Sequence, residues 1–334
     1  APDALTPAPP TRYFGTWQGD PARTADQVAL SIRVEVVGVN WMRLEPKPGE
    51  IDVAYVEKVR EQIRRFREAG ALVCLDFALQ YTPAWVFEIP HSRFMNQHGQ
   101  EYRDGDPGRD FPNGIFNRRV REAQARHAAN ALRLFGDDCY AVRMGWCEYG
   151  ELGFPRARFD GQRNCFWAYD AVAQGQSPEL LPEGLPPCPV PGWKPGAASP
   201  DHRDARAFAD WYLDALVDYQ NWQISVVRRH FKGPLQMMYP SWGLRPGVVE
   251  DLIAKDLASD TQEIQRGLDY ARLIRALPDP DVIVYCTWMD GDNPELEDDG
   301  PDPAKWSPMR YLAHLAHTHE PRLEAWGENS ANPS

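Results

Sequence analysis

The sequence has no apolar run near the roughly 18 residues that a membrane-spanning helix needs, so we expect no membrane segment. It also lacks a basic excess: 36 basic residues face 48 acidic ones, and the net charge of −12 argues against nucleic acid as a partner. The six cysteines form no CxxC pair and no zinc spacing. Cys165 and Cys188 flank an irregular stretch and could form a disulfide if the protein is exported.

Several cofactor signatures are missing as well. No GxGxxG turn follows the first expected strand, which weakens a nucleotide-binding reading. No His-x-His pair follows it either, and no lysine stands at a strand end for Schiff-base chemistry. Residues 290–302 are densely acidic but lack the EF-hand spacing, so we expect a solvated loop, with calcium as the alternative. We therefore predict no cofactor and no metal.

Short apolar runs with strand character alternate with helical stretches along the chain, a rhythm typical of parallel βα units. The expected strands are residues 13–17, 36–44, 72–77, 140–146, 235–239, 282–287 and 322–325. The expected helices are residues 24–33, 53–68, 116–135, 205–231, 261–277 and 308–317. Tryptophans stand at many strand ends at once, which favours a (β/α)8 TIM barrel over a doubly wound sheet, because all strand ends of a barrel meet at one mouth.

We expect a single catalytic domain over residues 13–334, preceded by a disordered lead over residues 1–12. A Pro- and Gly-rich insertion follows the fourth strand over residues 156–200, and a long excursion follows the third. An eighth strand is not evident after Trp326. The first residues, Ala-Pro-Asp, resemble the start of a mature exported protein, which predicts a secreted or periplasmic location, with the cytoplasm as the alternative.

Two segments place carboxylates where strands end. Residues 145–155 (GWCEYGELGFP) follow the fourth strand and carry Glu148 and Glu151, and residues 326–329 (WGEN) follow the seventh and carry Glu328. Cleavage of a glycosidic bond needs one carboxyl group to protonate the leaving oxygen and a second to activate water or attack carbon. We predict Glu328 as one of this pair and Glu151 or Glu148 as the acid.

Other side chains at strand ends could contact a sugar or orient the carboxylates. Arg43 follows the second strand, where it could equally form an ion pair with Glu45, and Asp76 closes the third. Asn329 follows Glu328. Although tryptophan is more often a core residue, the recurrence of aromatic residues at strand ends predicts sugar platforms. The predicted aromatic contacts are Trp41, Trp146, Tyr239, Trp242, Trp288 and Trp326.

The glutamate segments carry a family resemblance. Residues 145–155 resemble the segment that holds the general acid in the β-amylases (glycoside hydrolase family 14), and residues 327–331 resemble that family's general-base segment. Residues 41–49 (WMRLEPKPG) and 82–86 (TPAWV) are similar to family 42 β-galactosidases, whose acid/base would correspond to Glu148. Residues 75–81 lack the His and Asp with which β-amylases grip the terminal glucose, and Cys147 stands where the β-galactosidases have asparagine.

These observations predict a glycoside hydrolase that acts on an oligosaccharide or polysaccharide through two glutamates. The β-amylase resemblance implies inversion and the β-galactosidase resemblance implies retention; the carboxyl separation decides, at about 6.5–9.5 Å for inversion and about 5–5.5 Å for retention. A non-catalytic carbohydrate-binding protein on the same fold and a transglycosylase are the alternatives.

Overall fold

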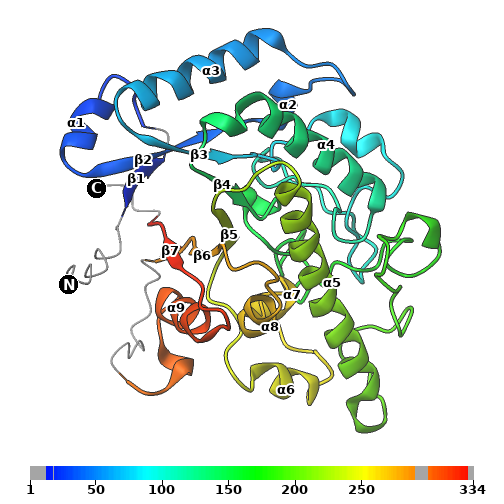
Figure 1. Cartoon of the computed structure of the whole chain (residues 1–334). Helices are drawn as coiled ribbons and strands as arrows, with labels where there is room; N and C mark the ends of the chain where they lie inside the picture. Colours follow the sequence, from blue (N-terminus) through cyan, green and yellow to red (C-terminus); the bar gives the residue numbers. More distant parts are fainter. Residues whose placement is uncertain (1–12, 18, 290–299, 330–334) are drawn as a thin grey trace.

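The computed structural model describes residues 13–17, 19–289 and 300–329. Seven parallel strands follow one another in chain order around a single curled sheet, which confirms the predicted TIM-barrel type of α/β fold (Figure 1). The strands are β1 (Phe14–Trp17), β2 (Ile32–Gly38), β3 (Leu72–Asp76), β4 (Ala141–Met144), β5 (Leu235–Tyr239), β6 (Val282–Cys286) and β7 (Ala325–Gly327). An eighth strand is not evident in the part of the chain that the structure describes.

Helices cover the outer face of the sheet. Figure 1 shows α3 lying along β2 and β3 and α9 beside β7, and both helices contact these strands. The helices are α1 (Thr24–Ala29), α2 (Trp41–Leu44), α3 (Val53–Glu68), α4 (Arg118–Phe135), α5 (Arg203–Arg228), α6 (Val248–Ile253), α7 (Gln262–Gln265), α8 (Tyr270–Arg275) and α9 (Pro308–Thr318). Short 3₁₀ turns complete the connections.

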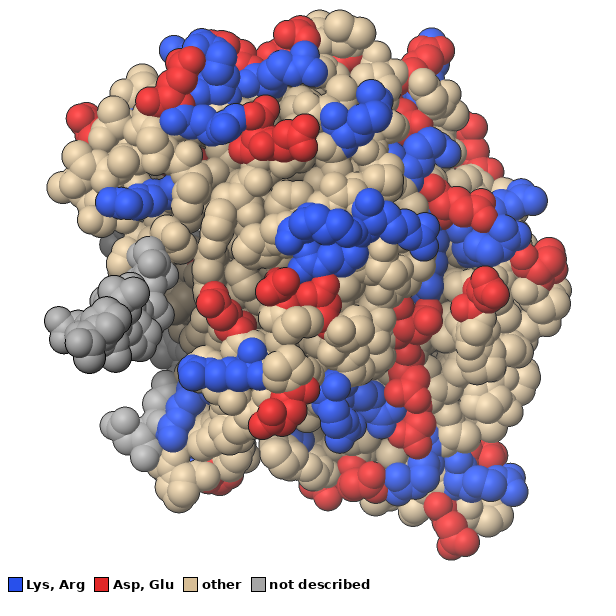
Figure 2. Space-filling model, in the orientation of Figure 1, with Lys and Arg blue, Asp and Glu red and all other residues tan. Residues whose placement is uncertain are grey.

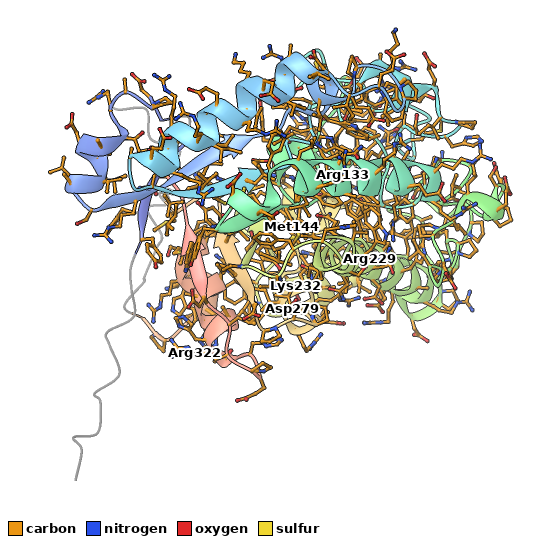
Figure 3. All side chains as sticks on the ribbon, turned by 45° about the horizontal axis from the view of Figure 1, so that its top comes forward. Arg133, Met144, Arg229, Lys232, Asp279 and Arg322 are labelled. Atoms are coloured by element: carbon orange, nitrogen blue, oxygen red, sulfur yellow. The ribbon has the colours of Figure 1, made fainter. Side chains whose placement is uncertain are left out.

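Each strand alternates between two environments, as the period of two requires. Val142 and Met144 of β4 belong to the large core between sheet and helices. Figure 3 shows Met144 in the region between α4, which carries Arg133, and the end of α5 beside Arg229. Arg143 points to the opposite, inner side of the curled sheet, where a smaller apolar cluster of Val34, Cys74 and Ala141 lies beneath it. The inner face therefore combines a small apolar floor with charged groups nearer the mouth.

The sheet is open between its first and last strands. Within the described residues, the strand pairs run from β1 to β7, and no pair joins β7 back to β1. The ring of Tyr13, just before β1, lies 6.2 Å from the ring of Trp326 in β7, measured between centroids. This aromatic contact bridges the opening, where a complete barrel would have backbone hydrogen bonds.

Several predicted boundaries are exact and others are displaced. The strand at 235–239 and the helix at 53–68 have the predicted bounds. The predicted strand at 36–44 is wrong in its second half: β2 ends at Gly38, and Trp41–Leu44 forms the short helix α2 because the Asn40 side chain caps the Arg43 amide. The predicted helix at 261–277 is divided into α7 and α8 at Gly267, whose φ is +74°.

The insertion at 156–200 packs against α5 through aromatic side chains. Phe166 contacts both Phe208 and Tyr212, with ring centroids 5.5 and 5.3 Å apart. Cys165 and Cys188 are buried in this region, and both thiols are free, so the possible disulfide is not formed. The predicted disordered lead at 1–12 and residues 290–299 of the acidic segment lie outside the described residues.

The charged surface is of mixed sign on the face that Figure 2 shows. Basic and acidic side chains alternate over α3 at the top of this view, where Arg60 pairs with Glu57 and Arg64 with Glu61 at three-residue spacing. Such exposed pairs stabilise a helix only slightly, by about 0.3–0.5 kcal/mol each. None of the described helices is long and apolar enough to cross a membrane.

Candidate active site

The three carboxylates that the sequence singles out stand beyond the carboxyl ends of β4 and β7. A 3₁₀ turn, Glu148–Gly150, follows β4, and Glu151 comes directly after it. Glu328 comes directly after β7, where its amide donates to the Cys286 carbonyl of β6 at 2.9 Å. The Met289 amide donates to the Glu328 carbonyl at 3.2 Å. Glu328 is thus fixed by backbone hydrogen bonds to the neighbouring strand.

Two residues, Arg143 and Tyr285, hold the Glu328 side chain. The Arg143 guanidinium reaches both carboxylate oxygens, with Nη1 2.9 Å from Oε2 and Nη2 3.1 Å from Oε1. The Tyr285 hydroxyl donates to Oε2 at 3.2 Å. Glu328 thus accepts two hydrogen bonds and forms an ion pair with Arg143. About a third of the Glu328 side chain (32%) stays exposed, so the fixed carboxylate still faces the solvent.

Arg143 lies beneath Glu328 in the interior of the sheet, with only 3% of its side chain exposed. Its Nε is 3.9 Å from Asp76 Oδ2 and 3.1 Å from the Met238 sulfur. Burial raises the pKa of Asp76, and the nearby charge of Arg143 opposes that rise. The structure therefore places Asp76 below the mouth, where it supports Arg143 from the side opposite Glu328.

Glu151 has a different environment. The Thr287 hydroxyl donates to its Oε1 at 2.5 Å, and Arg266 Nη2 lies 3.8 Å from its Oε2. Burial is the main cause that raises the pKa of Glu151; Arg266 and Thr287 oppose this rise, while the negative charges of Glu148 and Glu328 add to it. A fifth of the side chain (20%) is exposed. A carboxyl group that keeps its proton to higher pH is suited to donate it.

Glu148 is bound to structural cations. Its carboxylate forms a close ion pair with Arg156, and Arg266 Nη2 lies 3.6 Å from its other oxygen. Arg156 also lies 3.5 Å from Asp104, so it joins the excursion after β3 to the turn after β4. Only 10% of the Glu148 side chain is exposed. These contacts favour a structural role for Glu148 over a catalytic one.

The turn itself explains why two glutamates three residues apart differ so much. Tyr149 adopts a left-handed conformation with φ 53° and ψ 22°, which reverses the chain between them. The Trp146 amide donates to the Gly150 carbonyl at 2.9 Å, and a Cβ on Gly145 would come within 2.3 Å of that same oxygen. Gly145 is therefore required for the chain to fold back on itself, which separates the environments of Glu148 and Glu151.

The predicted sugar-binding aromatic residues divide into two groups. Trp41, Trp146 and Tyr239 are fully buried in the hydrophobic core and have no surface left for a sugar, so the structure places them as packing residues. Trp242 and Trp288, after β5 and β6, are half-buried and contact each other edge to face, with centroids 6.3 Å apart. Trp326 is half-buried against Tyr13, and its indole nitrogen donates to Glu324.

The remaining predicted contacts are accessible. Asn329 is exposed directly after Glu328. Arg43 is also exposed, and its guanidinium lies over the Tyr55 ring, 5.1 Å from the centroid, instead of pairing with Glu45. Glu45 is paired with Arg126. Within the described residues, no group of three or more His, Cys, Asp or Glu side chains is arranged to hold a metal ion.

Sequence reasoning missed the partners of the glutamates. These are Thr287, which binds Glu151; Tyr285, which binds Glu328; and the cations Arg156 and Arg266. Thr287 and Tyr285 lie within the predicted strand at 282–287. Thr287 is the last residue of that strand, and this position at the mouth of the barrel is the one signal that could have indicated it. Nothing in the sequence near Arg266 indicates a site.

No protein-family model and no curated protein sequence matches this chain. Solved structures do match it. The catalytic domain of β-amylase from Paenibacillus polymyxa superimposes with a TM-score of 0.65 at 13% identity, over 96% of this chain and 86% of that one.

Two β-galactosidases are similar over shorter parts of their length. The enzyme from the psychrophilic Marinomonas ef1 gives a TM-score of 0.53 at 13% identity, over 86% of this chain and 42% of its own. The enzyme from Bacillus circulans gives a TM-score of 0.51 at 14% identity, over 84% of this chain and 40% of its own. This chain thus spans less than half the length of either β-galactosidase. The predicted resemblance to both groups is confirmed at the level of the fold.

Proposed function

We propose that this protein is a glycoside hydrolase in which Glu151 is the general acid and Glu328 the base or nucleophile. The observation that carries the proposal is the contrast between two carboxyl groups at one mouth. Burial raises the pKa of Glu151, whereas Glu328 accepts hydrogen bonds from a buried guanidinium and a tyrosine. A carboxyl group that keeps its proton to higher pH, paired with a second carboxyl group fixed by hydrogen bonds, is an acid/base arrangement that glycosidic cleavage can use.

The reaction follows from these environments. Glu151 gives its proton to the departing glycosidic oxygen as the bond to the anomeric carbon breaks. Glu328 either removes a proton from water, which attacks the opposite face of the sugar, or attacks the anomeric carbon itself. Arg143 and Tyr285 hold the Glu328 carboxylate in one orientation, so little reorganisation is needed when the positive charge on the sugar ring develops.

The fold supports the proposal without fixing the substrate. The β-amylase domain and the β-galactosidases share this arrangement of strands and helices with it. We propose an oligosaccharide or polysaccharide as the substrate, because Trp242 and Trp288 form a pair of half-buried rings after neighbouring strands. Aromatic faces of this kind suit extended sugar chains better than a single small glycoside.

Proton NMR of the anomeric signals during digestion of α- and β-linked oligosaccharides tests the proposal. Inverted product would make Glu328 a base, and retained product would make it a nucleophile. Absence of product from every sugar, together with binding that survives Glu328→Gln, would refute hydrolysis in favour of a carbohydrate-binding protein. Product transferred mainly to a second sugar would indicate a transglycosylase.

Variants assign the roles. We expect Glu151→Gln and Glu328→Gln each to lower kcat by about 10²–10⁴-fold, because each removes one acid or base function. Glu151→Gln should recover much of its rate on an aryl glycoside whose leaving group departs without protonation, and Glu328→Gln should not. The matched control is Glu148→Gln, which we expect to retain activity within about tenfold where the protein stays folded. A larger loss in Glu148→Gln than in Glu151→Gln would reverse the assignment.

A further inference from the structure

A cavity of about 320 Å³ opens at the carboxyl ends of β1, β2 and β3 and against α3. Its wall includes Trp17 from β1, Gln80 and Tyr81 after β3, and Lys58 on α3. Arg43, on α2, stands on the same wall. The volume is within the range of sites that hold small molecules, which is about 300–1,000 Å³.

The charge of the cavity is opposite to that of the protein. Arg43 and Lys58 both line it, and no aspartate or glutamate is among the described residues of its lining. Over the described ranges of the chain, neither cation lies within ion-pair distance of a carboxylate. Arg43 is held over the ring of the buried Tyr55, whose hydroxyl accepts from the Asn40 amide at 2.9 Å. In a chain of net charge −12, two uncompensated cations in one cavity indicate an anionic ligand.

Gln80 supplies an independent indication of a ligand. Its side chain is only 4% exposed, and its Oε1 has no hydrogen-bond partner within the described structure. A buried acceptor without a partner costs free energy, so such groups in native proteins have an explanation, a ligand among them. Gln80 lines the cavity, and rotation of its side-chain amide would present this buried oxygen to a hydroxyl group bound there. The anion would therefore belong to a molecule that also carries hydroxyl groups.

Two residues of the cavity wall contact neighbours of the proposed catalytic pair. The Gln80 amide lies against Gly150, the residue before Glu151: a Cβ on that glycine would be 3.2 Å from Gln80 Oε1. On the other side, the Trp17 ring lies over the Arg143 guanidinium, 4.6 Å from it, and Arg143 binds Glu328. Gln80 and Trp17 thus connect the wall of the cavity to the segments that carry Glu151 and Glu328.

We infer that this cavity binds a sugar ring that carries an anionic substituent, with Arg43 and Lys58 at the anion and Gln80 at a ring hydroxyl. The inference rests on the proposed function for its role in hydrolysis, and it narrows the substrate to acidic carbohydrate. A carboxylate and a sulfate ester share the required charge, so the probes below separate them.

Calorimetric titration of the wild-type protein with monosaccharides tests the inference, since these sugars have no bond to cleave. The probes are D-glucuronate against D-glucose, D-galacturonate against D-galactose, and D-galactose 6-sulfate. We expect at least one acidic sugar to bind about tenfold more tightly than its neutral partner at low salt, and we expect added NaCl to reduce this preference. The carboxylate and sulfate arms identify which anion the cavity accepts.

Variants localise the effect. Arg43→Gln and Lys58→Gln should each weaken binding of the acidic sugar by about three- to tenfold and leave the affinity for the neutral sugar unchanged. Gln80→Met should weaken both sugars alike, because it removes the hydroxyl acceptor. Arg65→Gln is the control: it removes an exposed cation from the same helix as Lys58, outside the cavity, and should change neither. Arg43, Lys58 and Arg65 are exposed, so unfolding midpoints should stay close to that of the wild type.

Two outcomes overturn the inference: no acidic sugar binds more tightly than its neutral partner, or the preference survives the Arg43→Gln, Lys58→Gln double variant. Hydrolysis of neutral oligosaccharides by a protein that binds no acidic sugar more tightly than its neutral partner would refute the inference and keep the proposed function. Tight binding of an acidic sugar by a protein that cleaves no glycoside would keep the inference and refute the proposed function.

Discussion

The hydrogen bond between Thr287 and Glu151 gives the most specific prediction about the site. The Thr287 hydroxyl donates to Glu151 Oε1 at 2.5 Å and so stabilises the ionised carboxylate, which lowers its pKa against the larger rise that burial causes. Thr287→Val removes the donor and keeps the shape of the side chain. The charged form of Glu151 loses a partner, so its pKa should rise further.

The magnitude follows from the contact. A hydrogen bond to a charged group contributes about 1.5–3 kcal/mol, and one pKa unit corresponds to about 1.4 kcal/mol. Because a fifth of the Glu151 side chain is exposed, water replaces part of the lost bond. We therefore expect a rise of about one pKa unit. As a general acid works only while protonated, the alkaline limb of the kcat/KM profile should move to higher pH by about one unit.

The assay is the pH dependence of kcat/KM on the oligosaccharide that the anomeric screen identifies, with NMR titration of the Glu151 side-chain carboxyl carbon as a readout without turnover. Thr287→Ser, which retains the hydroxyl, is the matched control and should keep the wild-type profile. A shift of the alkaline limb to lower pH in Thr287→Val, or an equal shift in both variants, would refute the reasoning that Glu151 is the acid held by this bond.

Three further predictions concern other residues. Arg143→Gln leaves Asp76 without its buried partner and should cost about 3–5 kcal/mol of unfolding free energy at neutral pH. Burial already raises the pKa of Asp76, so the loss of unfolding free energy in Arg143→Gln should become smaller as the pH falls and Asp76 is protonated. Denaturant titrations at several pH values measure this loss, and a loss that grows on acidification would contradict the prediction. Trp41→Phe should lower stability by about 1–3 kcal/mol and leave KM unchanged, since Trp41 is buried; an altered KM in steady-state kinetics would restore its predicted sugar contact. Trp288→Ala should raise KM about three- to tenfold with little change in melting temperature, and an unchanged KM would remove Trp288 from the substrate path.

Local sequence signals were sufficient where the local pattern and the packing agree. The amphipathic stretch at 53–68 forms a helix with the predicted bounds because Asp52 caps its first turn and Gly70 follows its end. The pattern failed at 36–44, where apolar residues continue past the end of β2. There the Asn40 side chain captures the Arg43 amide and starts a helix, and Trp41 packs into the core instead of facing the mouth.

The candidate site was predictable only in part, for a related reason. Glu151 and Glu328 could be found because each follows a strand, and strand ends of a barrel converge. Their partners could not, because the decisive contacts join distant parts of the chain: Arg143 and Glu328 are 185 residues apart, and Thr287 and Glu151 are 136 apart. Which arginine reaches which glutamate depends on the register of the strands, and short motifs carry no record of that register.

The choice between Glu148 and Glu151 shows what the structure adds to the motifs. The β-amylase-like motif assigns the acid to Glu151 and the β-galactosidase-like motif assigns it to Glu148, and only three residues separate them. Glu148 is bound by Arg156 and lies near Arg266, and these contacts hold it in place. Burial raises the pKa of Glu151, which favours its protonated form. A proton donor is needed at the mouth, so the environments favour Glu151, and the left-handed turn at Tyr149 is the local feature that sets the two glutamates apart.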